Sequence, residues 1–512
     1  MKTTNISIKI AVFRGFQAPE TGTLVGYGAL IEAFNLAMPL PETLSLISEK
    51  RRSYRENEWI VYSNKTQFED TLYKHLVFAL KNEGINLLFF KKLFEILPEN
   101  EVVELLSIEG TGQYTRKIWF LYEWLLEKEL PIPNLEIKNY VPLVDEKLQY
   151  TLSHGARSSR HRIINNLPGT VDFCPLIRKT PKLEKYRSEN LSAQKNNYLK
   201  GIRKSVLQRA SAFLLLKDSK ASFTIEGESP KSKRAARWGQ AIGQAGMHNL
   251  SHGEFERLQQ IVIENTRFVE MGYRKKGGFI GERDSDSFSP VPDHISAKTE
   301  DIEQLMNGLI ATNNLLLNDE TDAVLAAAVI SFGFVFIHPF VDGNGRIHRY
   351  LIHHVLSKKH FSDQGLIFPV SASILNHIAD YQKVLENYSA PLLDFMEWKE
   401  TQDHNIEVTN NTIDFYRYFD ATKQAEFLYD CVKDTIINII PNEVTYLTKY
   451  EEFKSYLDNI FEMPDDMVAL LVRFLEQNNG AFSNRAKEKE FKQLSTAEIA
   501  DIEENYKLIF AN

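Results

Sequence analysis

Residues 338–349 read His-Pro-Phe-Val-Asp-Gly-Asn-Gly-Arg-Ile-His-Arg, and the fold is best approached from this stretch. An apolar run from Ala323 to Ile337 precedes it, and apolar residues at helical spacing follow it from Arg346 to Lys359. The sequence therefore predicts two helices joined by a short loop, residues 342–345, whose two glycines relax the steric limits on the backbone.

The loop has the chemistry of an anion site. Glycines on both sides of Asn344 let backbone N–H groups converge on an anion, and the helix that follows favours negative charge at its N-terminus. Arg346 and Arg349 lie three apart on the first turn, where both can bind phosphate as bidentate forks. Asp342 is a candidate Mg²⁺ ligand, and His338 a candidate base. Each feature alone is an ordinary turn or surface residue, but together they favour a nucleotide site.

The same stretch resembles the signature of the Fic family, His-Pro-Phe-x-Asp-Gly-Asn-Gly-Arg-x-x-Arg, at every fixed position. The resemblance implies an enzyme, a nucleotidyltransferase that moves AMP from ATP to a Ser, Thr or Tyr hydroxyl of a target protein. It implies that His338 is catalytic and deprotonates the hydroxyl. It also implies that Asp342 holds Mg²⁺, or Mn²⁺, between the α- and β-phosphates.

The resemblance assigns nucleotide-binding roles to the rest of the loop. Gly343, Asn344 and Gly345 would form the anion-binding backbone, with Asn344 nearest the α-phosphate. Arg346 and Arg349 would bind the β- and γ-phosphates.

Three aromatic residues near the motif have separate expectations. Phe340 is expected to anchor the loop in the core, and His348, at a position that the family leaves free, is expected to be exposed. Tyr381, on a helix after the motif, either lines the adenine pocket or belongs to the core.

A second stretch, residues 222–227, reads Ser-Phe-Thr-Ile-Glu-Gly and resembles the inhibitory motif of the Fic class with an N-terminal inhibitory helix. The resemblance makes Ser222, Glu226 and Gly227 inhibitory residues. The Glu226 carboxylate can pair with Arg349 and so take the guanidinium that the γ-phosphate needs, within its own chain. In some relatives this glutamate helps water to remove AMP, so Glu226 is a brake, a hydrolytic residue or both. The plain alternative is a glutamate that ends a helix.

Residues 273–284 resemble the family's flap, a hairpin beside the active site. We expect Gly277 and Gly278 to form its tight turn and residues 290–292 to lead on to a helix at 302–316. The edge of the flap would bind an extended target segment by backbone hydrogen bonds. Its target-binding residues would be Gly278, Phe279, Ile280 and Gly281.

Composition is that of an ordinary globular protein, with 43% hydrophobic and 25% charged residues over 512 residues. A net charge of −8 argues against a surface that coats nucleic acid. Cys174 and Cys431 lie far apart and give neither a disulfide framework nor a zinc spacing, which fits a cytoplasmic protein. We expect no secretory signal and no membrane span, because the longest apolar run is shorter than the roughly 18 residues that a span requires.

The predicted fold class is mainly α. An all-helical Fic core with a short β-hairpin flap would occupy residues 186–400. A mainly helical N-terminal domain with a basic connector would cover 1–185, and a helical C-terminal domain 401–512. The connector, residues 153–187, could contact nucleic acid, but an acidic surface of the same protein is the favoured partner.

Two hypotheses remain from the sequence. The first is a protein adenylyltransferase held back by Glu226, with removal of AMP as an optional second activity; transfer of UMP, phosphocholine or phosphate from another donor stays open. The alternative is a regulatory protein that senses ATP and binds DNA or a partner through its flanking helices. The base His338 favours the enzyme, because a sensor does not need a base. The sequence leaves a monomer and a homodimer open.

Overall fold

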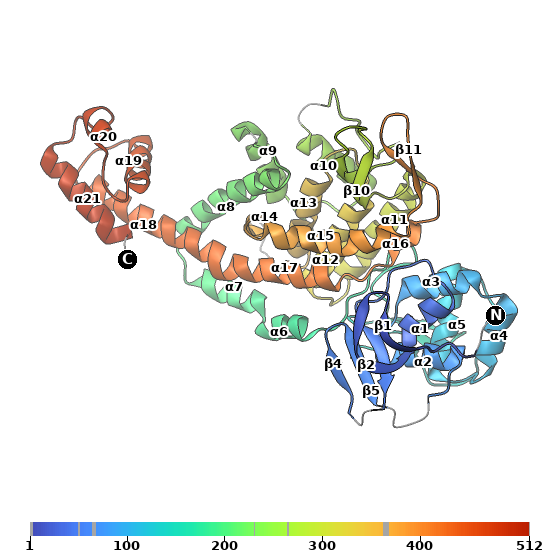
Figure 1. Cartoon of the computed structure of the whole chain (residues 1–512). Coiled ribbons are helices and arrows are strands. Elements are labelled where there is room, and N and C mark those ends of the chain that lie inside the picture. Colours follow the sequence, from blue (N-terminus) through green and yellow to red (C-terminus); the bar gives the residue numbers. More distant parts are fainter. Residues whose placement is uncertain are drawn as a thin grey trace.

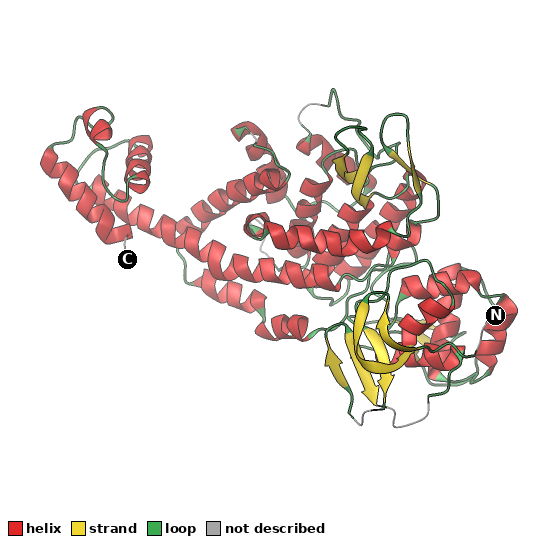
Figure 2. Ribbon diagram, in the orientation of Figure 1, coloured by secondary structure: helices red, strands yellow, loops and turns green. Residues whose placement is uncertain are grey.

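The computed structural model describes residues 4–49, 52–63, 68–229, 231–263, 266–361 and 368–510. Helices dominate it, and the strands gather in the N-terminal region and in small hairpins (Figure 2). The chain is therefore mainly α, as predicted. Figure 1 shows the N-terminal region against one side of a helical core, and the C-terminus beside the long helix that leads away from that core.

The N-terminal region contains a five-stranded sheet that the sequence analysis did not predict. Its strand order is β1-β2-β3-β5-β4, antiparallel except for the parallel pair β3 and β5. The strands are short or mixed in burial, so their period-2 signal is weak. Their bounds are Lys9–Phe13, Phe16–Val25, Leu44–Ser48, Tyr54–Glu56 and Trp59–Ser63 for β1, β2, β3, β4 and β5.

Five helices complete the described part of this region before the connector, in keeping with its predicted mainly helical character. Thr71 and Asn86 cap α2 and α3, and each accepts a hydrogen bond from the backbone N–H three residues on, as short polar side chains do at helix starts. Trp119 and Phe120 of α5 face the core. The bounds are Gly26–Ala33, Leu72–Asn82, Leu87–Ile96, Glu99–Ser107 and Gln113–Leu126 for α1 to α5.

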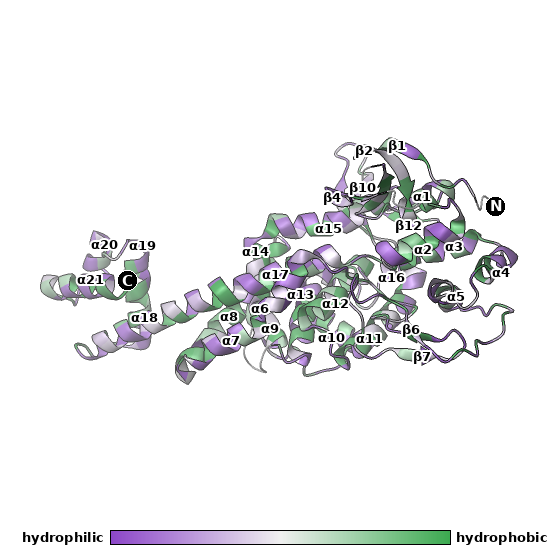
Figure 3. Cartoon of the chain, turned by 90° about the horizontal axis from the view of Figure 1, so that it is seen from below, coloured by the Kyte–Doolittle hydropathy of each residue, from purple (hydrophilic) through white to green (hydrophobic). Residues whose placement is uncertain are grey.

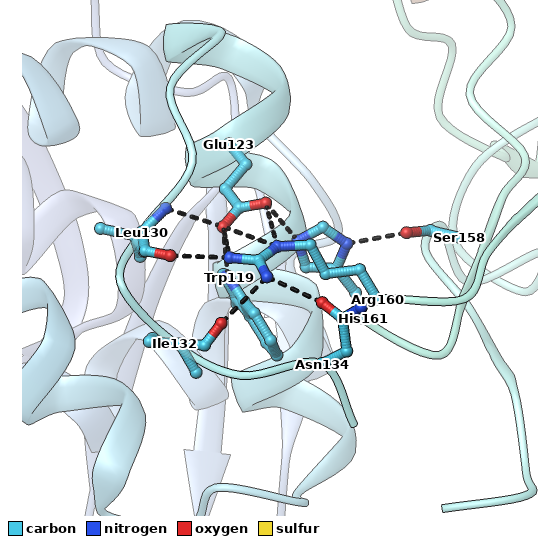
Figure 4. Close-up of polar contacts among 8 residues, drawn as sticks. All are labelled: Trp119, Glu123, Leu130, Ile132, Asn134, Ser158, Arg160 and His161. Atoms are coloured by element: carbon cyan, nitrogen blue, oxygen red, sulfur yellow. Dashed lines mark hydrogen bonds and ion pairs between the residues drawn. The ribbon is translucent and has the colours of Figure 1, made fainter. Parts of the chain in front are cut away.

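The basic connector is tied to α5 by a polar cluster around Glu123 (Figure 4). The Glu123 carboxylate accepts hydrogen bonds from Arg160, from Trp119 Nε1 at 2.7 Å and from the Leu130 N–H at 2.9 Å. The His161 Nε2 lies 2.9 Å from it. Arg160 therefore lies against an acid of its own protein, as favoured from the sequence. The cluster also includes Ile132, Asn134 and Ser158.

The connector continues along the core. A three-stranded sheet in the order β6-β8-β7 is followed by α6 and α7. Arg178 pairs with Asp420 at 2.9 Å and Lys182 with Asp430 at 2.7 Å, so basic residues of this segment hold it against the core. The bounds are Val141–Pro142, Ala156–Ser158 and Ile163–Asn165 for β6, β7 and β8, and Pro181–Glu189 and Leu191–Lys200 for α6 and α7.

The centre of the core is α12 (Ala323–Ile337), whose residues from Val324 onward are all buried. This confirms the predicted central helix. It packs against α13 (Asn344–Lys358), α11 (Ile302–Leu317) and α17 (Thr422–Asp434). The other helices around the site are α8 (Lys204–Ile225), α9 (Ser232–Gly243), α10 (His252–Val262), α14 (Val370–Asn376) and α15 (Ile378–Leu393), with a 3-10 turn, η1 (Thr299–Asp301), before α11.

The flap is a hairpin, but its turn is not where the sequence placed it. Its strands are β9 (Phe279–Arg283) and β10 (Pro290–Ile295), so residues 290–292 form the second strand instead of a lead to a helix. Gly277 and Gly278 precede β9, and a side chain on Gly277 would overlap the Ile406 carbonyl. Ile406 belongs to a second hairpin, formed by β11 (Trp398–Glu400) and β12 (Ile406–Val408). This second hairpin therefore packs against the start of the flap.

The C-terminal region divides differently from the predicted boundary at residue 401. Residues up to Leu447 contribute to the main core, through α16 (Ile413–Arg417), α17 and the π-helical η2 (Thr435–Ile439). A separate hydrophobic cluster begins at Phe453. In Figures 1 and 3 it lies at the far end of α18. It is formed by α18 (Ile440–Asp458), α19 (Asp465–Gln477), α20 (Asn484–Glu488) and α21 (Thr496–Phe510).

Both cysteines are free and buried. Within the part of the chain that the structure describes, every helix is too short or too polar to cross a bilayer.

Candidate nucleotide site

The motif loop is folded by its own side chains. Helix α12 ends at His338, whose φ of 53° turns the chain into the loop, and α13 begins at Asn344. The Asn344 amide donates to the Phe340 carbonyl at 2.8 Å and accepts from the Phe340 N–H at 3.0 Å. Phe340 is buried, as expected of a core anchor. Asn344 thus fixes the loop with its side chain, and the N–H groups of the first turn of α13 are left for an anion.

His338 is held as a neutral base. Its Nδ1 lies 3.1 Å from the Val335 carbonyl, which can only accept, so Nδ1 carries the proton and Nε2 is the basic atom. Burial is the main cause that lowers the pKa of His338 to about 4; the bond to Val335 opposes it, and the charge of Arg274 adds to it. The ring is therefore neutral near pH 7, and Nε2 is able to accept a proton.

Arg274 connects this histidine to the flap. The Arg274 Nε donates to the His338 carbonyl at 2.8 Å, Nη1 to the Lys276 carbonyl at 3.0 Å, and Nη2 to the Ala297 carbonyl. The backbone N–H of Arg274 also donates to Pro339. The flap and the motif loop are consequently one hydrogen-bonded unit.

Arg349 is paired with the predicted inhibitory residues. Its Nη2 lies 2.8 Å from Glu226 Oε1, and its Nε donates to Ser222 Oγ at 3.0 Å. A Cβ on Gly345 would lie only 2.1 Å from Glu226 Oε1. The carboxylate therefore sits directly on the N-terminus of α13, where the predicted phosphate would lie.

Arg346 is paired with two further carboxylates. Its Nη2 donates to Asp342 Oδ1 at 2.7 Å, and its Nη1 lies 2.7 Å from Glu228 Oε1. Both arginines are almost completely buried, at 2% and 1% side-chain exposure for Arg346 and Arg349. Burial of a guanidinium requires such partners.

These contacts join α8 to α13 at successive helical turns. On α8, residues 218, 222 and 226 recur at a spacing of four, which places them on one face. Asp218 lies 2.9 Å from His353 Nε2 of α13 and also accepts from the N–H and Oγ of Ser371. Asp218 is fully buried. It therefore fixes the position of α8 along α13, so that Glu226 reaches Arg349.

Tyr381 and His348 lie side by side in the core behind the arginines. Burial raises the pKa of Tyr381 to about 12, while the neighbouring Arg349 acts to lower it. The rings of His348 and Tyr381 are stacked at 5.9 Å. The prediction that His348 is exposed is wrong: it is fully buried, its Nδ1 is 2.7 Å from the Ser331 carbonyl, and burial lowers its pKa to about 3.

The four predicted target-binding residues lie at the start of the flap. Gly278 accepts from the Ser296 N–H, while Phe279 pairs with Ile295 in the hairpin. Ile280 is 45% exposed. Gly281 has a φ of 149°, and a side chain there would overlap the Val291 carbonyl. An apolar side chain on this strand is therefore available to a partner.

Asp342 fits a cation that arrives with a nucleotide. Its side chain is 48% exposed. Magnesium is usually held by one or two carboxylates together with substrate phosphates. Asp342 can supply one such carboxylate, and the nucleotide would supply the phosphates. Over the described ranges, no group of three or more His, Cys, Asp or Glu side chains is placed to hold a metal ion. The residues present suit a shared cation rather than a protein-only cage.

Sequence reasoning missed three members of the site, Asp218, Glu228 and Arg274. The first lies one helical turn before Ser222, so extending the spacing of four would have found it. Glu228 follows the glycine that ends α8, and its position depends on the turn. Arg274 gave no signal, because its partners are backbone carbonyls of distant segments.

Comparison with known proteins finds a similar family for the part of the core that carries the glycine loop and the paired arginines. Residues 249–356 match the model of the Fic/DOC family, so this part of the core is similar to a Fic domain. A curated relative, the "Protein adenylyltransferase Fic" of Nematostella vectensis, is 38% identical over 74 residues. That match covers 14% of this chain and 17% of the relative, so the chain spans a small part of the relative's length.

Two solved structures are also similar. A Fic family protein from Desulfovibrio desulfuricans G20 has a TM-score of 0.39 at 18% identity, over 64% of this chain and 86% of that chain. A Fic domain-containing signaling protein from Bacteroides thetaiotaomicron VPI-5482 has a TM-score of 0.35 at 16% identity, over 52% of this chain and 97% of that chain.

Proposed function

We propose that this chain is a protein adenylyltransferase that transfers AMP from ATP to a Ser, Thr or Tyr hydroxyl of a target protein, and that Glu226 holds it inactive. The observation that carries the proposal is the position of the Glu226 carboxylate, which is paired with Arg349 and lies against Gly345 at the N-terminus of α13. A carboxylate bound there indicates that the site favours anions, and the same carboxylate blocks the site for a phosphate.

In the proposed reaction, His338 Nε2 accepts the proton of the target hydroxyl as its oxygen attacks the α-phosphorus. The bond from that phosphorus to the β-phosphate oxygen breaks, and pyrophosphate leaves. Backbone N–H groups at the start of α13 and the guanidiniums of Arg346 and Arg349 bind the phosphates. A magnesium ion held by Asp342 would neutralise charge on the α- and β-phosphates. The flap would align the target beside His338.

The test uses the purified protein, Glu226→Gly, and the double variant Glu226→Gly/His338→Ala. Each is incubated with Mg²⁺ and with ATP labelled at either the α- or the γ-phosphate, and label on protein is measured. We expect Glu226→Gly to incorporate α-label at least about tenfold faster than the unchanged protein, since a charged hydrogen bond that opposes the nucleotide is removed. The double variant should remain unlabelled. Incorporation of γ-label would overturn AMP transfer.

A second activity, removal of AMP, follows from the same glutamate. Glu226 would then orient a water against the phosphodiester. The Glu226→Gly protein is first labelled with α-labelled ATP and separated from free nucleotide. It is then mixed with either unlabelled unchanged protein or unlabelled Glu226→Gly protein. Release of labelled AMP by the unchanged protein, and none by the Glu226→Gly protein, is the expected result. If neither protein releases AMP, Glu226 acts only as a brake.

A further inference from the structure

Glu228 is a second carboxylate at the same anion site, and the proposed reaction does not use it. Its Oε1 lies 2.7 Å from Nη1 of Arg346, while Nη2 of that arginine pairs with Asp342 at 2.7 Å. Both terminal nitrogens of Arg346 are therefore in ion pairs with protein carboxylates. This guanidinium is as blocked as that of Arg349.

The end of α8 brings the two glutamates to the two arginines together. The Gly227 N–H donates to the Thr224 carbonyl at 2.9 Å, and the Glu228 N–H donates to the Phe223 carbonyl at 3.0 Å. With a φ of +73° at Gly227, this is the hydrogen-bond pattern of a Schellman turn. These two hydrogen bonds fix the backbone between Glu226 and Glu228, so one turn sets the positions of both carboxylates.

A third arginine holds Glu228 from the other side. Arg234 of α9 forms a close ion pair with Glu228 Oε2. The guanidiniums of Arg234 and Arg346 lie 4.6 Å and 5.3 Å from the centre of the Phe223 ring. Glu228 thus bridges two arginines over one aromatic ring, and it keeps a partner in Arg234 when it leaves Arg346.

Exposure shows which member of the pair can be exchanged. The Glu228 side chain is 32% exposed, whereas Arg346 is 2% exposed. An anion from solvent can reach the carboxylate side and replace it, while the buried guanidinium stays in place. Because Arg234 remains bound to Glu228, this exchange leaves no carboxylate without a cation.

We infer that Glu228 is a second inhibitory residue, which blocks Arg346 as Glu226 blocks Arg349; this inference rests on the proposed function. A nucleotide must displace both carboxylates to reach both arginines. A triphosphate carries enough negative charge to replace both carboxylates, so this double block favours ATP over nucleotides with fewer phosphates. Removing Glu226 alone would leave the site half blocked.

The test measures binding of Mg²⁺–ATP by calorimetry and α-label incorporation for Glu228→Gln, Glu226→Gly and the double variant. We expect the double variant to bind ATP roughly fivefold more tightly than Glu226→Gly, and to be labelled faster. Glu451→Gln is the matched control, because Glu451 pairs with Arg209 on the outer side of α8 at 3.3 Å. It should change neither quantity. Equal or weaker ATP binding by the double variant overturns the inference.

Arg234→Gln gives a change of opposite sign. Without Arg234, Glu228 keeps only Arg346, so ATP should bind several-fold more weakly than to the unchanged protein. Tighter binding would contradict the inference.

The two proposals fail separately. If Glu226→Gly incorporates no AMP but Glu228→Gln still tightens ATP binding in that background, AMP transfer is wrong and the second inhibitory residue stands. If Glu226→Gly is labelled and Glu228→Gln changes neither binding nor labelling, the second inhibitory residue is wrong and AMP transfer stands.

Discussion

The cluster around Glu123 and the site around Arg349 use the same kinds of side chain, but the buried member differs. In the N-terminal cluster the Glu123 carboxylate is 8% exposed and its partner Arg160 is 19% exposed. In the site, Arg349 is 1% exposed and Glu226 is 35% exposed. A solvent anion cannot replace a buried acid, but it can replace an exposed one. The first arrangement therefore fixes structure, and the second can exchange its acids for phosphates.

This contrast predicts very different costs for removing each acid. Glu123→Gln should lower the free energy of unfolding by about 3 kcal/mol, because it removes one partner of a buried ion pair and leaves Arg160 uncompensated. Glu226→Gln should lower it by less than about 1 kcal/mol, because a buffer anion can take the exposed position. Urea unfolding in phosphate buffer measures both. Equal costs would show that the two clusters do not differ in this way.

The histidines of the two regions extend the contrast to pH. Burial is the main cause that lowers the pKa of both His161 and His338, but Glu123 opposes it for His161. For His338 the pKa falls to about 4, below the roughly 6.5 of an unfolded chain. The unfolded state then binds the proton more readily, so stability falls as the pH drops from about 6.5 towards 4.

Between pH 7 and 4.5 we therefore expect the unchanged protein to lose about 2 kcal/mol more than His338→Gln, measured by urea unfolding at each pH. His154→Gln, at an exposed position, serves as the control and should follow the unchanged protein. A constant gap between the unchanged protein and His338→Gln would contradict the depressed pKa.

Much of the site could be predicted from the sequence because its chemistry is local. The motif lies within one helix, loop and helix, and Glu226 reaches Arg349 because both lie on packed helices with regular spacing. His348 was misplaced because its position was read from the motif alone. His348 lies three residues before Leu351 and four residues before Ile352, and this spacing places it on the apolar face of α13.

The parts that escaped prediction depend on distant contacts or on turn geometry. The N-terminal sheet joins β3 and β5 in parallel across an intervening strand, a pairing that short strands do not reveal. The sequence predicts the turn of the flap at Gly277 and Gly278, but both precede β9, and the small size of Gly277 instead lets the second hairpin approach. Glu228 is positioned by the backbone of Gly227, which residue spacing does not encode.

Gly345→Ala tests whether the exposed acid and the nucleotide share one position. The added Cβ would lie 2.1 Å from the present Glu226 Oε1. In the Glu226→Gly background, this change should weaken ATP binding at least about tenfold, because a phosphate at the helix N-terminus meets the same methyl group. Folding should be preserved, since Ala favours a helix over Gly.

The control is Gly253→Ala in α10, where an added Cβ meets nothing within 4 Å. It should leave ATP binding unchanged. Full ATP affinity in Glu226→Gly/Gly345→Ala would place the nucleotide elsewhere.

The smallest expected effect concerns the turn that carries both exchangeable acids. Gly227 has a φ of +73°, and an added Cβ there meets nothing within 4 Å, so Gly227→Ala acts only through the backbone. An alanine in this conformation costs about 1 kcal/mol, and loosening the turn should release Glu226 and Glu228 together. Gly227→Asn should cost less, because asparagine tolerates the left-handed region. We expect α-label incorporation to rise severalfold for Gly227→Ala and less for Gly227→Asn. The unfolding temperature should likewise fall more for Gly227→Ala than for Gly227→Asn. The opposite order for the two variants would mean that the side chain, and not the backbone turn, sets the position of the two acids.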